Sequence, residues 1–98
     1  MWIGWIELDL LLGDVHSLKM KRSVVRPIIA EVRRRHELTV AEVDHLDVYR
    51  RAGIGAAVVA ADRARVVDVL DGVERLVAAR PEIELLSVRR RLRTSEDE

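Results

Sequence analysis

Along residues 2–12, positions without polar side chains alternate with positions that include two acidic residues. The even-numbered residues are Trp2, Gly4, Ile6, Leu8, Leu10 and Leu12, and the odd-numbered residues are Ile3, Trp5, Glu7, Asp9 and Leu11. A period of two residues is typical of a β-strand that is covered on one face. We therefore predict a strand here, with the first set of side chains facing the core.

Two later segments carry apolar residues at helical spacing. The first is predicted to run from Leu18 to Arg35, with the Ser17 side chain as its N-cap. Its apolar stripe consists of Met20, Val24, Val25, Ile28, Ile29 and Val32. The second helix follows a cap at Asp62 and ends before Pro81, since proline commonly stands just beyond the end of a helix. Both helices are expected to bury one apolar face.

Three further strands are predicted over residues 37–44, 53–61 and 83–92, which are rich in Val, Ile and Leu. No Asn-Gly or Asp-Gly turn separates the first two, so an irregular loop is expected between them. The order βαββαβ predicts an α+β, ferredoxin-like fold, in which a four-stranded antiparallel sheet carries two helices on one face. Residues 1–93 form this single domain, and the acidic tail, residues 94–98, is predicted to be disordered.

The composition narrows the possible functions. The chain has 98 residues, which suit one domain, and no Cys, which excludes disulfide scaffolds, zinc ribbons and thiol enzymes. The histidines, His16, His36 and His45, lack the spacing of a metal site, so neither a metal nor another cofactor is expected. No apolar run approaches about 20 residues and no signal-peptide pattern is present, so we expect a cytoplasmic protein without membrane contact.

Charge is unevenly distributed, although the formal net charge is zero. Residues 14–35 contain seven basic and two acidic side chains, whereas residues 37–47 contain four acidic side chains and no Lys or Arg. A helix N-terminus surrounded by cations can hold a phosphate. The predicted anion- or RNA-binding residues are Ser17, Lys19, Lys21, Arg22, Arg26 and Arg33. The alternative is that Lys19 and Arg22 pair with the acidic segment and hold the helix against the hairpin.

The acidic segment carries Glu42, Asp44 and Asp47, followed by the aromatic Tyr49. Carboxylates grouped on a hairpin can act as general acids, bases or cation ligands, which would make the chain a hydrolase. A solvated or salt-bridged loop explains the same residues without catalysis. We expect no enzymatic activity and interpret these four residues as a structural or partner-binding motif.

The face of the predicted sheet without helices is expected to expose Ile3, Trp5 and Leu11. An uncovered apolar patch of this kind usually marks an interface. We therefore predict a homodimer that covers this face. A homodimeric adaptor that docks other proteins through the surface around Trp5 is the alternative function.

The chain resembles a known family in three short motifs. They are Ser17-Leu18-Lys19 followed by Lys21-Arg22, then Val40-Ala41-Glu42-Val43-Asp44, and finally Asp47 with Tyr49. Together they are similar to the YlxP-like family of small bacterial proteins of unknown function, over residues 2–92. The resemblance implies a ferredoxin-like fold and a tendency to dimerise. Family genes often stand beside those for transcription elongation, translation initiation and ribosome maturation factors, which implies a link to RNA or ribosomes.

The predicted function is a non-catalytic binding module linked to bacterial translation or ribosome maturation. It would contact rRNA or a ribosomal partner through the basic first helix, where phosphate contacts would make binding sensitive to salt. The homodimeric adaptor would instead associate through apolar surface, in a way that tolerates salt.

Overall fold

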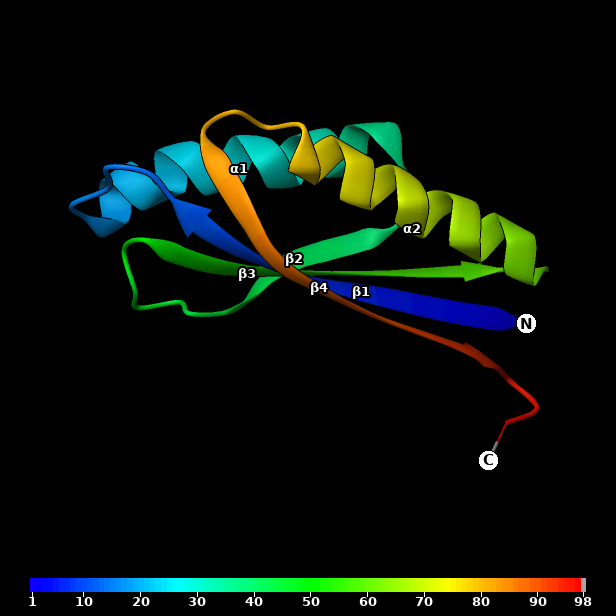
Figure 1. Cartoon of the computed structure of the whole chain (residues 1–98). Helices are drawn as coiled ribbons and strands as arrows, with labels where there is room; N and C mark the ends of the chain where they lie inside the picture. Colours follow the sequence, from blue (N-terminus) through cyan, green and yellow to red (C-terminus); the bar gives the residue numbers. More distant parts are fainter. Residues whose placement is uncertain (98) are drawn as a thin grey trace.

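A computed structural model describes residues 1–97 and shows a four-stranded sheet with two helices on one side (Figure 1). The elements in chain order are β1 (Trp2–Leu12), α1 (Leu18–Arg35), β2 (Thr39–Asp44), β3 (Arg51–Ala60), α2 (Arg63–Ala78) and β4 (Ile83–Thr94). The strand order is β2-β3-β1-β4, and each pairing is antiparallel. The predicted ferredoxin-like βαββαβ fold is confirmed.

Strand β1 lies between β3 and β4 and shows the predicted alternation. Its even-numbered side chains from Ile6 to Leu12 are buried beneath the helices, whereas the odd-numbered ones are partly exposed on the opposite face. Gly4 belongs to the buried set, and a Cβ at this position would overlap Val66 Cγ1 of α2. The missing side chain therefore allows α2 to approach the sheet closely.

Both helices begin at the predicted caps. Ser17 Oγ accepts a hydrogen bond of 3.1 Å from the Met20 amide, and Asp62 Oδ1 accepts one of 2.8 Å from the Arg65 amide. The predicted stripe of α1 is wrong at Met20, which is 40% exposed, because Lys21 takes the inward position in the first turn. Within residues 1–97, neither helix is long and apolar enough to cross a membrane.

Four strand boundaries differ from those predicted. Strand β2 begins two residues later than expected, whereas β3 begins two residues earlier and ends at Ala60. Strand β4 continues to Thr94, which pairs with Trp2. The Ser95 amide then donates to the carbonyl of Met1 at 2.8 Å, and residues 95–97 form a turn. The predicted disordered tail therefore does not include Thr94, which pairs with Trp2 of β1, and residue 98 lies outside the described residues.

Ion pairs link the helices to other elements. Arg90 of β4 donates hydrogen bonds to Asp71 at 2.7 Å and to Glu74 at 2.9 Å, both on α2. Burial alone would lower the pKa of Arg90, but the bonds and negative charges of these two carboxylates raise it. Arg80, which follows α2 in the chain, pairs with Glu31 of α1 at 2.9 Å. Charged side chains thus help to fix α2 against both β4 and α1.

Candidate nucleic-acid interface

Three basic residues form an exposed line along the first half of α1. Lys19, Arg22 and Arg26 are spaced three and four residues apart, so their side chains lie on the same side of the helix. Within residues 1–97, none of the three makes an ion pair with a carboxylate. The alternative prediction, that Lys19 and Arg22 pair with the acidic segment, is therefore wrong. We call these three residues the α1 ridge.

Two other residues predicted to bind an anion make contacts within the fold. The hydroxyl of Ser17 accepts from the first turn of α1, so its oxygen serves the helix. Arg33 Nη2 donates a hydrogen bond of 2.8 Å to the carbonyl of Val40 and links the end of α1 to β2. Neither side chain belongs to the free cationic surface of the α1 ridge.

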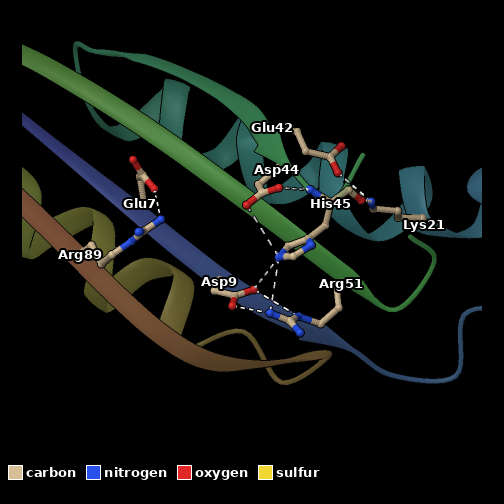
Figure 2. Close-up of polar contacts among 8 residues, drawn as sticks. All are labelled: Glu7, Asp9, Lys21, Glu42, Asp44, His45, Arg51 and Arg89. Carbon is tan, nitrogen blue, oxygen red and sulfur yellow. Dashed lines mark hydrogen bonds and ion pairs between the residues drawn. The ribbon is translucent and has the colours of Figure 1, made fainter. Parts of the chain in front are cut away.

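Lys21 is buried, in contrast to its neighbours on α1. Only 2% of its surface is exposed. Its ammonium lies 2.8 Å from Glu42 Oε2 and donates a hydrogen bond of 2.6 Å to the carbonyl of His45 (Figure 2). Glu42 Oε2 is also buried and has no aligned hydrogen-bond donor among residues 1–97, so charge and proximity hold the pair. The prediction that Lys21 binds an external anion is wrong, because it fastens α1 to the β2–β3 hairpin.

A β-bulge divides the acidic segment between the two faces of the sheet. The register of β2 shifts between Glu42 and Asp44, with Val43 as the extra residue. Residues two apart in a regular strand share a face, but here Glu42 points toward α1 and Asp44 toward the open face. Asp47 and Tyr49 are exposed in the following loop. The carboxylates suggested as a catalytic or cation-binding group are thus not brought together.

Asp44 and His45 belong to a polar cluster on the open face (Figure 2). His45 has a left-handed backbone, with φ of 57°, and its amide donates to Asp44 Oδ1 at 2.8 Å. The ring atom Nε2 lies 3.7 Å from Asp9 Oδ1 and 3.4 Å from Arg51 Nη2. Gly53 lines a hollow of about 230 Å³ beside these side chains. No signal in the sequence identifies this cluster, since its members come from β1, the hairpin and β3.

The charges of this cluster are largely paired. Arg51 forms an ion pair with Asp9, and Arg89 of β4 forms one with Glu7 of β1 (Figure 2). Both carboxylates of β1 therefore already have cationic partners within the fold. Within residues 1–97, no set of three or more His, Asp or Glu side chains is arranged to hold a metal ion.

The rest of the open face is apolar on one side and basic on the other. The predicted dimer-face residues, which are all half-buried on this face, are Ile3, Trp5 and Leu11. Trp5 borders a shallow hollow of about 290 Å³, which Val43 and Ala57 also line. Val43 and Val59 are 53% and 60% exposed, and the sequence did not point to either of them. Val59 could have been found from its pairing with Ile3 once the register was known.

The basic side of this face comes from β4. Arg91 pairs in register with Trp5, and Arg93 pairs with Ile3, so two arginines border the apolar surface. Both are exposed.

The chain is similar to a protein family and to a bacterial protein of that kind. A family described as protein of unknown function (DUF503) matches residues 3–90. The uncharacterized protein YlxP of Bacillus subtilis (strain 168) is 30% identical over 82 residues, which are 84% of this chain and 89% of that protein.

Two solved structures share the fold. A de novo designed protein with a ferredoxin fold, LFR1 1, superposes with a TM-score of 0.55 and 16% identity, over 99% of this chain and 89% of the designed one. A mutant of SnoaB, a cofactor-independent oxygenase from Streptomyces nogalater, has a TM-score of 0.50 and 13% identity, over 99% of this chain and 95% of its own. At such identities the likeness shows the fold alone.

Proposed function

We propose that this chain, which belongs to the family described as protein of unknown function (DUF503), is a non-catalytic RNA-binding module of the bacterial cytoplasm. Its partner would be rRNA, or a ribosomal particle that presents rRNA, in translation or ribosome maturation. The observation that carries the proposal is the α1 ridge, where three exposed cations have no carboxylate partner among residues 1–97.

The distribution of ion pairs supports this proposal. The chain carries equal numbers of acidic and basic residues, so its surface has no overall attraction for RNA. Several cations elsewhere are nevertheless paired, as in Arg51 with Asp9, Arg89 with Glu7, and Arg90 with Asp71. The α1 ridge therefore keeps its charge available in one place. Lys and Arg side chains in such a line can follow the phosphates of an RNA backbone.

A salt titration tests the proposal. Binding of a fluorescent rRNA fragment is measured by anisotropy at increasing KCl for the wild type and for the triple variant Lys19→Gln, Arg22→Gln and Arg26→Gln. With three fewer phosphate contacts, fewer counterions are released on binding. The slope of log affinity against log salt should therefore become less negative by about 2 to 3. Affinity at low salt should fall as well, while the fold is unchanged.

A matched control removes the same charge elsewhere. Three other arginines are exposed and form no ion pair within residues 1–97, namely Arg63, Arg91 and Arg93. Changing all three to Gln should leave the salt dependence of RNA binding near that of the wild type. An equal loss in both triple variants would show a general charge effect and would contradict a specific role of the α1 ridge. Unchanged binding by the α1 ridge variant would contradict the proposal directly.

A homodimeric adaptor is the second candidate function, and the exposed apolar side chains on the open face favour it. Trp5, Val43 and Val59 lie on a face that neither helix of the described residues covers, and a second copy of the chain would remove them from water. Sedimentation equilibrium should then show a dimer that Trp5→Glu converts to a monomer. Leu46→Glu, which changes an exposed hairpin residue, should remain dimeric. A monomeric wild type at micromolar concentration would exclude this candidate.

A further inference from the structure

An open cleft of about 660 Å³ lies between the end of α1 and the second half of α2. Three guanidinium groups, those of Arg35, Arg75 and Arg80, line it together with the imidazole of His36 and one carboxylate, that of Glu31. The cleft is separate from the α1 ridge, whose residues belong to the first half of α1.

The guanidinium groups of the cleft are not equally engaged. Arg80 makes two close ion pairs, at 2.9 Å to Glu31 and at 2.6 Å to Glu82. Arg35 reaches Glu31 only at 3.9 Å, and Arg75 makes no ion pair within residues 1–97. Arg35 and Arg75 thus retain most of their donors for a ligand.

The charge balance of the cleft favours an anion. Arg65, whose charge also acts on His36, and Glu82, the second partner of Arg80, belong to the same balance, so four guanidinium groups outnumber two carboxylates by two when His36 is neutral. The carboxyl ends of α1 and α2 also border the cleft, and each contributes roughly half a negative charge. Together these ends offset about one of the two excess positive charges. The remaining charge is positive.

His36 is seated inside this positive environment. Its ring packs against Gly72 of α2, where a Cβ would lie only 2.6 Å from His36 Cε1. A glycine within a helix costs about 1 kcal/mol relative to alanine, and the close approach of the ring accounts for its presence here. Burial lowers the pKa of His36, and the positive charges of Arg35, Arg65 and Arg75 lower it further.

We propose that this cleft binds a phosphate group, with Arg35 and Arg75 as its main ligands and His36 beside it. Guanidinium groups present paired donors that match the oxygens of phosphate. A bound phosphate would also favour the protonated imidazole, which then becomes an additional donor. The phosphate could be free or part of an RNA backbone. The cleft does not depend on the α1 ridge, so this site and the proposed function can fail independently.

The His36 ring provides the test. Its C–H resonance, assigned with His36→Gln, is followed against pH by NMR in phosphate and in chloride of equal ionic strength. Phosphate should raise the pKa of His36 by about one unit, saturably. Arg75→Gln should raise this pKa in chloride and abolish the further response to phosphate. Arg63→Gln removes an exposed charge elsewhere on α2 and should behave as the wild type.

Two results would overturn the site. One is an identical His36 titration in phosphate and chloride, and the other is a phosphate response that survives Arg75→Gln. A short RNA that raises the pKa of His36 and is displaced by phosphate would identify the RNA backbone as the source of the phosphate. A response to phosphate but not to RNA would identify a small ligand. The triple variant of the α1 ridge should keep the phosphate response in either case.

Discussion

Lys21→Met tests whether the buried lysine holds α1 to the hairpin. Methionine keeps most of the buried hydrocarbon of Lys21 but removes the ammonium, which contacts Glu42 and the carbonyl of His45. Removing one partner of a fully buried pair costs about 3–5 kcal/mol. The Glu42 side chain is 23% exposed, so water would reach part of the carboxylate left alone. We therefore expect a smaller loss, of about 2–3 kcal/mol.

Urea unfolding followed by circular dichroism measures this loss. In a domain of about 100 residues it corresponds to a decrease in melting temperature of roughly 10–20 °C. Lys19→Met is the control, because the exposed neighbour should change the free energy of unfolding by no more than about 0.5 kcal/mol. The double variant Lys21→Met with Glu42→Gln should regain part of the loss, since no uncompensated charge remains buried. A Lys21→Met protein as stable as the Lys19→Met control would refute the structural role of this lysine.

Three further predictions concern close packing and pH. Gly4→Ala should destabilise the protein by about 1–3 kcal/mol in urea unfolding, because its Cβ would overlap Val66, and Val66→Ala should partly restore stability. Gly72→Ala should displace the His36 ring toward water, so NMR should find the pKa of His36 closer to 6.5 than in the wild type. Because the pKa of His36 is lowered in the folded protein, the unfolded chain takes up a proton first, and stability should fall as the pH drops through about 6.5. His36→Gln should weaken that dependence, as urea midpoints on either side of this pH would show.

The type and order of the helices and strands could be predicted from local sequence patterns. The alternation of residues 2–12 identified the central strand and its buried face, and Ser17 and Asp62 marked the helix starts. These signals are local, because periodicity and capping depend on residues close together in the chain. The predicted ends of the strands were less accurate, because pairing with a distant partner decides where a strand stops. Strand β4, for example, continues to Thr94 because Thr94 pairs with Trp2.

The contacts of the polar side chains could not be predicted from the sequence in the same way. Hydrophobicity favours Met20 over Lys21 for the inward position of α1, and only the presence of Glu42 beside the ammonium reverses this order. The bulge at Val43 has no Gly or Pro to mark it, yet it decides which face Asp44 reaches. Such features depend on residues far apart in the chain, and a single sequence does not reveal their pairing.

The pairing of the first strand with the last has a consequence for synthesis of the chain. Leu8 of β1 lies opposite Val88 of β4, so one side of the central strand stays open until the last segment has been translated. Until then, β1 presents unpaired backbone groups and apolar side chains, which are prone to pair with other chains. Although β4 is an edge strand, a nascent chain that stalls before residue 83 would expose the middle of the sheet and become a substrate for aggregation or degradation.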